Sequence, residues 1–554
     1  MDRPLYSSPF DGLQDSILNK PEAIAYHLIE ANGDRFDLSY RDVLDLATRA
    51  KGFYQGIGIR ESEVVILALT ASRAFLALYL AALAEGIIPL VVSFPTGAEW
   101  PDGASEKLAQ LAVQVNACAI CVAARPEQLP DSLKKMSIHV FPEFEDLSPV
   151  QLQFSGKQPD HIAHYQATSG STGNPKIAIV RHGNLAANVL GIGHALGHRA
   201  EDKLVSWLPL SHDMGLVGLS YSLYWQCPLI WSPPSKFVRN PFFWLRMISD
   251  YQGTLSPAPN SAFHICARLA QRRRFTGIDL SSWRVALCGS EPVYEETMLA
   301  FQRAFKVMGY RAETMLPVYG LAEATLAVSI PKVDEQPYVE SIDAELLRNE
   351  PVATLAGHDG PGVKRMVNVG QPIIQHALRI ADNKDQPVPN RHLGEVQVKG
   401  PSIISGYLNN EAATRAAMTE DGFLRTGDIG YLSDEGLYIL GRKKEIIIIH
   451  GKNYAYNDIE NQVKNLLDRN LVREVVAFAA FRSDLGSEQL HLAIEGVPRV
   501  DETFRSDASS RIQLYLADQL ELKNVQIHWA QKGTIPKTTS GKLQRHLCSG
   551  LFLS

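Results

Sequence analysis

One short segment of the chain concentrates the groups that bind a triphosphate. Residues 165–176 read Tyr-Gln-Ala-Thr-Ser-Gly-Ser-Thr-Gly-Asn-Pro-Lys. Glycines let a backbone approach phosphate oxygens closely, hydroxyl groups donate hydrogen bonds, and the ammonium group of Lys176 balances negative charge. The segment is not a Walker A loop, because that motif runs Gly-Lys-Ser/Thr without a break and here Pro175 precedes the lysine. The alternative interpretation is a flexible polar loop, which is common on protein surfaces.

Four further segments carry side chains suited to nucleotide chemistry. In order, they are Gly289-Ser290-Glu291-Pro292, Tyr319-Gly320-Leu321-Ala322-Glu323, Arg425-Thr426-Gly427-Asp428 and Pro536-Lys537-Thr538-Thr539-Ser540-Gly541-Lys542. A carboxylate can hold a metal ion and a lysine supplies a fixed positive charge, and chemistry at a phosphate group needs both. Glu323 and Lys542 are candidates for these two roles.

Each of these residues also has an ordinary structural interpretation. Asp428 is compatible with a cap on a turn, Glu323 with a charge on a helix surface, and Lys542 with a surface lysine. All five segments nevertheless occur together in one order, and chance matches to short motifs do not accumulate in this way. The combination therefore favours the catalytic interpretation.

Together the five segments resemble the motifs of the adenylate-forming superfamily of acyl-CoA synthetases, luciferases and peptide-synthetase adenylation domains. The resemblance extends from about Tyr40 to Arg545 and implies ATP and Mg²⁺ as cofactors. It implies nucleotide contacts from Thr168, Ser169, Gly170, Ser171, Thr172, Gly173, Lys176, Gly289, Ser290, Glu291, Pro292, Tyr319, Gly320, Asp428 and Arg442. It also implies Mg²⁺ ligands at Glu323 and Thr168, and catalysis by Lys542 together with Glu323.

Residues 207–216, Trp-Leu-Pro-Leu-Ser-His-Asp-Met-Gly-Leu, correspond to the wall of the acid pocket in that superfamily. The chain lacks the Phe-Asp pair with which peptide-synthetase domains hold an α-amino acid. Its His-Asp-Met-Gly pattern is similar to that of fatty acyl-AMP ligases, which implies a fatty acid, a catalytic role for His212 and transfer to the phosphopantetheine thiol of an acyl carrier protein. The chain departs from that subfamily at Ser211, where Tyr is usual, and at Tyr456, where Pro is usual.

The stretch from Pro331 to Gly370 is rich in Pro, Gly, Asp and Glu, which predicts an insertion carrying long loops. It lies where fatty acyl-AMP ligases carry an insertion that is linked, in that subfamily, to poor use of coenzyme A. The alternative is a surface loop without a specific role.

Two other functions stay open. One is an acyl- or aryl-CoA ligase with the same first half-reaction, which differs in its thiol acceptor. The other is an inactive acyl or nucleotide binder, which is disfavoured because Lys176, Glu323, Asp428 and Lys542 are all present.

The composition is that of an ordinary soluble enzyme. Hydrophobic residues make up 45% and charged residues 21%, and the formal net charge of −6 gives no electrostatic footprint for nucleic acid or an anionic membrane. The most apolar stretch, Val64 to Val92, is interrupted by Arg73, Glu85 and Pro89, too early for the roughly 20 apolar residues of a transmembrane segment. Since no apolar signal sequence follows Met1, we expect a cytoplasmic enzyme.

These motifs require an α/β framework with more than one domain. Apolar runs such as Val64-Val65-Ile66-Leu67 alternate with helical patterns such as Ser72 to Ala84, and 554 residues exceed what one core usually supports. We expect a large N-terminal adenylation domain of several subdomains over residues 1–443. A small mobile α+β domain over residues 444–554 would carry Lys542, with the hinge at Lys444.

Overall fold

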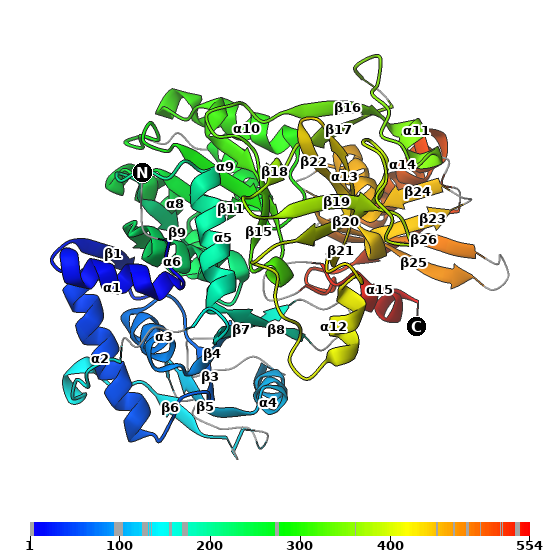
Figure 1. Cartoon of the computed structure of the whole chain (residues 1–554). Helices are drawn as coiled ribbons and strands as arrows, with labels where there is room; N and C mark the ends of the chain where they lie inside the picture. Colours follow the sequence, from blue (N-terminus) through cyan, green and yellow to red (C-terminus); the bar gives the residue numbers. More distant parts are fainter. Residues whose placement is uncertain are drawn as a thin grey trace.

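A computed structural model gives the fold. It describes residues 5–93, 104–124, 131, 133–134, 136–153, 158–168, 175–271, 276–360, 362–449, 452–468, 471–482, 487–498, 500–520, 522, 524–537 and 543–553. The mixed α/β fold class is confirmed, with the N-terminal elements at one end of the molecule and the C-terminal elements at the other (Figure 1).

Two large, mostly parallel sheets form the frame of the N-terminal part. One has the order β6-β5-β3-β4-β7-β8, and the other has the order β13-β12-β11-β9-β10-β1-β2. Only the pairs β7·β8 and β1·β2 are antiparallel within these two orders. The first sheet contains β3 (Val64–Ala68), β4 (Ile88–Val91), β5 (Ala117–Val122), β6 (Ile138–Val140), β7 (Ile162–Thr168) and β8 (Lys176–Arg181). The second contains β1 (Ile24–Ile29), β2 (Arg35–Ser39), β9 (Leu204–Ser206), β10 (Leu229–Trp231), β11 (Leu255–Pro259), β12 (Val285–Gly289) and β13 (Met315–Pro317).

Helices fill the space between and around these sheets. Every residue of α3 from Phe75 to Ala84 is buried, because this helix is apolar on all sides and lies in the core that both sheets share. Ser72 begins the helix by accepting a hydrogen bond from the backbone of Phe75, and Gly86 ends it in the left-handed conformation. The helices of this part are α1 (Pro9–Asn19), α2 (Tyr40–Gly56), α3 (Arg73–Glu85), α4 (Ala104–Gln114), α5 (His182–Ala195), α6 (Asp213–Trp225), α7 (Pro234–Arg239), α8 (Phe242–Tyr251), α9 (Asn260–Ala270) and α10 (Glu295–Phe305).

A third, antiparallel sheet follows along the chain and has the order β19-β20-β21-β22. Its strands are β19 (Ala377–Ala381), β20 (Gly394–Lys399), β21 (Leu424–Ser433) and β22 (Gly436–Arg442), with α12 (Glu411–Ala417) between β20 and β21. A small sheet of β14 (Tyr319–Gly320), β15 (Ala327–Ile330) and β18 (Gln371–Pro372) precedes it.

The stretch from Pro331 to Gly370 combines loops with regular elements. It contains the antiparallel pair β16 (Val339–Asp343) and β17 (Val363–Val367), with α11 (Ala344–Asn349) between them. Glu340 on β16 is buried, and its carboxylate binds both Arg391 and the hydroxyl of Tyr431. The charge of Glu340 is therefore paired inside the fold.

The C-terminal elements have a hydrophobic core of their own. They comprise β23 (Ile446–Ile449), β24 (Lys452–Ala455), α13 (Tyr456–Leu466), β25 (Val472–Arg482), β26 (Ser487–Gly496), α14 (Glu502–Leu520), β27 (Gln526–Ala530) and α15 (Arg545–Phe552). Lys444 lies in the short 3₁₀ turn Lys443–Glu445 that joins β22 to β23. These features are compatible with the proposed division at residues 443 and 444.

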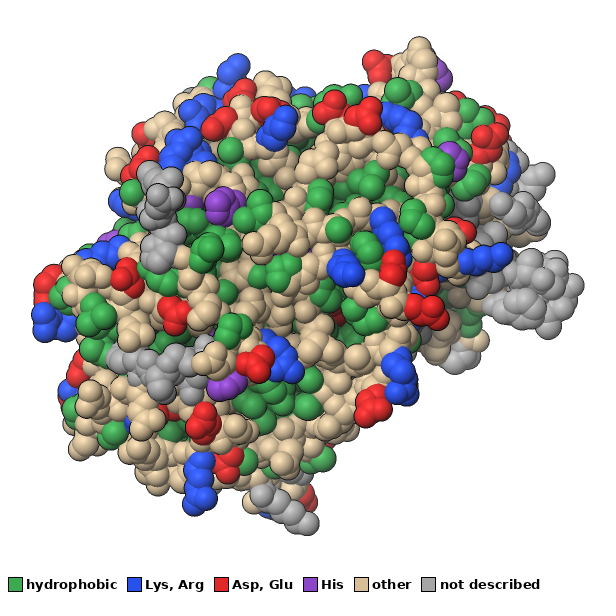
Figure 2. Space-filling view, in the orientation of Figure 1, with side chains coloured by type: hydrophobic (Ala, Val, Ile, Leu, Met, Phe, Trp, Pro, Cys, Tyr) green, Lys and Arg blue, Asp and Glu red, His purple; other side chains and the backbone are tan. Residues whose placement is uncertain are grey.

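The surface is mixed in charge. Acidic and basic side chains are interspersed on the face shown in Figure 2. Within the described parts of the chain, no helix combines the length and the apolar character that a membrane span requires.

Candidate active site

The strands β7 and β8, which flank the predicted phosphate loop along the chain, form an antiparallel pair. Thr168 and Lys176 are paired across the two strands, and the Thr168 hydroxyl donates to the Lys176 carbonyl at 3.2 Å. The predicted residues Ser169, Gly170, Ser171, Thr172 and Gly173 lie outside the described residues.

Tyr407, which none of the sequence motifs indicated, contacts both Lys176 and Glu323. The Tyr407 hydroxyl donates to Glu323 Oε1 at 2.8 Å, and Lys176 Nζ lies 4.7 Å from the centre of the Tyr407 ring. Tyr407 is held against β8, because its backbone pairs with Ala178 in an isolated bridge. Burial and the neighbouring Glu323 raise the pKa of Tyr407, so the phenol stays protonated and donates its hydrogen bond at neutral pH.

The turn that carries Glu323 is held from behind by α5. The side-chain amide of Asn188, fully buried on that helix, donates to the carbonyls of Ala324 and Ala327 and accepts from the Ala327 amide. Thr325, with φ 68° and ψ −51°, occupies a conformation that a β-branched residue rarely adopts and that costs about 1–3 kcal/mol. The Thr325 hydroxyl donates to the Ser402 carbonyl at 2.6 Å, which helps to hold this turn in place.

Asp428 forms a second polar cluster with two other predicted residues. It lies opposite Arg442 on β21 and β22, and Arg442 Nε is 2.8 Å from its Oδ1. The Tyr319 hydroxyl donates to Oδ2 at 2.5 Å. Burial raises the pKa of the Asp428 carboxyl, and Glu323 adds to this effect, whereas Arg442 and the Tyr319 hydrogen bond oppose it. Tyr319 lies four positions before Glu323 in the chain, so this cluster adjoins the one around Tyr407.

The predicted adenine segment runs beside Tyr319. A side chain at Gly289 would approach the Val318 carbonyl oxygen to 2.9 Å, so only glycine allows this contact. Gly320 is more restricted, because a Cβ there would lie 2.0 Å from the Leu326 carbonyl oxygen. Ser290, which precedes Glu291 and Pro292, has a positive φ of 69°, and the Glu291 carboxylate accepts from the Ser261 amide at the start of α9.

His212 lies at the N-terminus of α6, in the predicted acid-pocket segment. Gln166, two residues before Thr168 on β7, donates to the carbonyl of Ser211 at 2.8 Å. The structure therefore brings the His212 segment to the end of β7.

Lys542 lies outside the described residues, but both flanks of its segment are described. Lys537 and Leu543 form an antiparallel bridge, so the chain enters and leaves the segment at one place. Arg545 then begins α15, and its guanidinium binds the buried Glu460 carboxylate at 3.0 and 2.8 Å. This ion pair fixes the chain three positions after Lys542.

The side-chain oxygens of Glu323 and Thr168 suit a Mg²⁺ ion that is bound together with a nucleotide. Mg²⁺ favours carboxylate and hydroxyl oxygens and is commonly held by one or two protein ligands together with substrate phosphates. Among the described residues no group of three or more His, Cys, Asp or Glu side chains is arranged to hold a metal. The Glu323 carboxylate and the Thr168 hydroxyl match the donor chemistry of a metal that binds together with its nucleotide.

Tyr407, Asn188 and Arg545 are the residues that the motif analysis missed. None stands in a segment whose composition signals chemistry. Tyr407 and Asn188 reach the site through contacts between parts of the chain 84 and 139 positions apart.

The comparisons with known proteins agree on one family. The family described as AMP-binding enzyme matches residues 13–408. The medium-chain-fatty-acid–[acyl-carrier-protein] ligase TtuA of Teredinibacter turnerae is 30% identical, over 95% of this chain and 90% of its own length. The ligase JamA of Moorena producens, with the same descriptive name, is 32% identical over 100% and 96%.

Solved structures show the same likeness. One, from a study of fatty acyl-adenylate ligases from E. coli and L. pneumophila, has a TM-score of 0.86 and 27% identity, covering 99% of this chain and 97% of its own. The L. pneumophila fatty acyl-adenylate ligase in complex with acyl adenylate and pyrophosphate has a TM-score of 0.72 and 28% identity, with coverage of 98% and 96%.

Proposed function

Because this chain belongs to the AMP-binding enzyme family, we propose that it activates a fatty acid as acyl-AMP and transfers the acyl group to an acyl carrier protein. In the first step a carboxylate oxygen attacks the α-phosphorus of ATP, and the bond to pyrophosphate breaks. In the second step the phosphopantetheine thiolate attacks the acyl carbonyl carbon, a thioester forms and AMP leaves.

One observation carries the proposal: Tyr407 contacts both Lys176 and Glu323, and Tyr319, four positions before Glu323, binds Asp428 together with Arg442. Lys176 would balance the charge of the phosphates, and Asp428 would accept hydrogen bonds from the ribose. Glu323 and Thr168 would hold Mg²⁺, which supplies positive charge to the phosphate oxygens. Lys542 would add positive charge as the two anions approach, and His212 would border the reacting carboxylate.

The proposed acyl acceptor and the proposed acid substrate both rest on the names of the relatives. Two of them are named medium-chain-fatty-acid–[acyl-carrier-protein] ligases, and this chain spans nearly their whole length. A medium-chain fatty acid is therefore the proposed substrate, and a carrier protein is the proposed acceptor.

Pyrophosphate release against a panel of acids tests the proposal. The panel runs from short to long aliphatic acids and includes aromatic acids. Release should be highest for a medium-chain fatty acid, and a preference for aromatic or α-amino acids would contradict it.

A further inference from the structure

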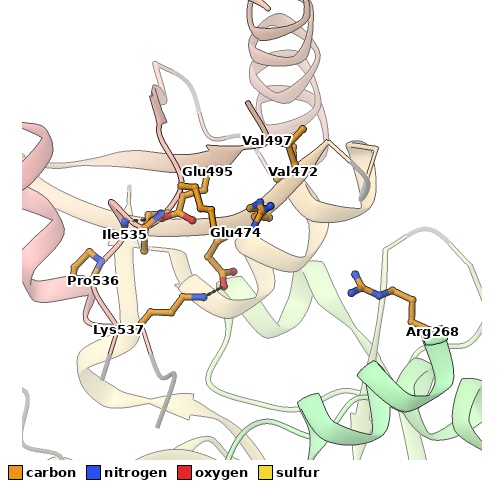
Figure 3. Close-up of a pocket in the computed structure, with 11 residues that line it drawn as sticks. Arg268, Val472, Glu474, Glu495, Val497, Ile535, Pro536 and Lys537 are labelled. Atoms are coloured by element: carbon orange, nitrogen blue, oxygen red, sulfur yellow. Dashed lines mark hydrogen bonds and ion pairs between the residues drawn. The ribbon is translucent and has the colours of Figure 1, made fainter. Parts of the chain in front are cut away.

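One cavity outside the predicted site lies between the C-terminal elements and α9. Its volume is about 770 Å³, and its walls come from α9, from β25 and β26, and from the segment that leads to Lys542. Arg268 on α9 faces the C-terminal strands across the cleft (Figure 3). The cleft therefore lies where the two parts of the chain face each other.

Both acidic side chains of this cleft, Glu474 and Glu495, have hydrogen-bond partners. Glu474 binds Lys464 at 2.5 Å and Lys537 at 2.7 Å, and although burial opposes ionisation, these lysines keep the pKa of Glu474 below its usual range. The Glu495 carboxylate accepts hydrogen bonds from the amides of Gly533 and Ile535, which holds the segment before Lys537 in place.

Three further side chains that line the cleft are basic. Arg268, Arg473 and Lys532 are exposed, and none of the three forms an ion pair with another residue in the described parts of the chain. On a chain of net charge −6, the cleft is thus locally positive on both sides. Val472, Val497 and Ile535 add apolar surface among these charges.

We propose that this cleft is the docking surface for the carrier protein, which would place an acidic surface and the phosphodiester of its prosthetic arm against Arg268, Arg473 and Lys532. The inference rests on the proposed function, because it needs a carrier-protein acceptor. Exposed cations at a rim increase the rate of encounter and fix orientation more than they add affinity, which suits a partner that must leave after each turnover. These three cations that line the cleft are exposed, whereas a tight site for a free small anion would use buried charged donors.

The position of the cleft suits this partner. The folded carrier protein is too large to enter the site, so it must bind at a rim and extend its arm inward. Lys537 lines the cleft, is bridged to Leu543 and precedes Lys542 by five positions in the chain. Contacts from both α9 and the C-terminal strands would let the carrier protein recognise the two parts together.

Charge reversal tests the inference in the full-length enzyme. The variants are Arg268→Glu, Arg473→Glu with Lys532→Glu, and all three together, with Lys107→Glu on the distant helix α4 as the matched control. The acceptor is a holo acyl carrier protein that the wild-type enzyme acylates. We expect kcat/KM for the carrier protein to fall on the order of tenfold in each cleft variant and further in the triple variant. Fatty-acid-dependent pyrophosphate release should be unchanged in all variants.

Salt supplies a second readout. Acylation by the wild type should slow as ionic strength rises, and the triple variant should lose most of this dependence. Unchanged carrier-protein kinetics in the triple variant would overturn the inference. An effect of the Arg473 and Lys532 changes without an effect of Arg268→Glu would also overturn it, since both sides of the cleft are required. Equal loss with coenzyme A would show a phosphate site rather than a protein-docking surface. If the wild type acylates no holo carrier protein although it forms acyl-AMP, the proposed acceptor itself is wrong.

Discussion

Tyr407 donates a hydrogen bond to Glu323 at 2.8 Å although the two residues are 84 positions apart in the chain. The same ring contacts Lys176, so one side chain connects the predicted metal ligand with the predicted phosphate-binding cation. A hydroxyl that holds one carboxylate oxygen would leave the other oriented toward a metal.

Tyr407→Phe should lower kcat about tenfold or more, because a hydrogen bond to a charged group contributes about 1.5–3 kcal/mol. The ring and its contact with Lys176 remain, so the change isolates the hydroxyl. The Mg²⁺ concentration for half-maximal rate should rise with it. Tyr54→Phe is the control, since this buried tyrosine loses a hydrogen bond to Leu78 far from the site. Equal kinetics in both variants would remove Tyr407 from the site.

Asp428 should give ATP binding a distinctive pH dependence. Because burial raises its pKa, protonation should begin at a higher pH than for an ordinary aspartate, so the KM for ATP should rise as the pH falls toward that value. The effect on folding has the opposite sign. A raised folded-state pKa stabilises the fold below the unfolded value, and this contribution is lost as the pH rises through the folded value.

Asp428→Ala should raise the KM for ATP, since the lost hydrogen bonds to the ribose cost about 1.5–3 kcal/mol. Steady-state kinetics from pH 5 to pH 8 compare the variant with the wild type. A variant that keeps the wild-type KM and its pH dependence would exclude a role in nucleotide binding.

Lys542→Ala should abolish adenylation while ATP still binds, because the lysine would act mainly on the transition state. Calorimetric ATP binding and pyrophosphate release separate the two effects. Near-normal release would contradict the assignment.

Glu460→Gln should destabilise the C-terminal elements by about 1–3 kcal/mol, because Arg545 loses its buried carboxylate partner and keeps only the more exposed Glu445. Urea unfolding followed by the fluorescence of Trp529 measures this loss. Asp507→Asn removes an exposed pair with Arg511 and should cost less than about 1 kcal/mol. Similar losses in both variants would show that the Glu460 pair has no special weight.

The insertion contacts the C-terminal part through an ion pair between Lys364 on β17 and Asp458 on α13. If the insertion restrains the swing of the small domain, Lys364→Glu should leave acyl-AMP formation largely intact and raise acyl-CoA formation. The double variant Lys364→Asp with Asp458→Lys should restore the wild-type preference. A folded, adenylating Lys364→Glu variant without any gain in coenzyme A use would show that this contact does not restrain the swing.

Contiguous motifs could be predicted from the sequence, whereas contacts between distant segments could not. Asp428 stands in a recognisable motif, and its partner Arg442 follows on the next strand. Asn188 offers no such signal, because its role depends on α5 packing against the turn at Ala327, 139 positions away. The burial of Glu340 could not be predicted for the same reason. Its partner Arg391, whose ion pair allows the carboxylate to be buried, is 51 positions away in the chain.

Direct detection of the intermediate tests the central proposal most sharply. The enzyme is mixed with ATP, Mg²⁺ and a medium-chain fatty acid without acceptor, and bound acyl-AMP is measured by mass spectrometry before and after an acceptor is added. We expect acyl-AMP to accumulate and to disappear as thioester forms on a holo acyl carrier protein, much faster than with coenzyme A. Absence of acyl-AMP with every fatty acid, or discharge by coenzyme A at the rate seen with the carrier protein, would contradict the proposal.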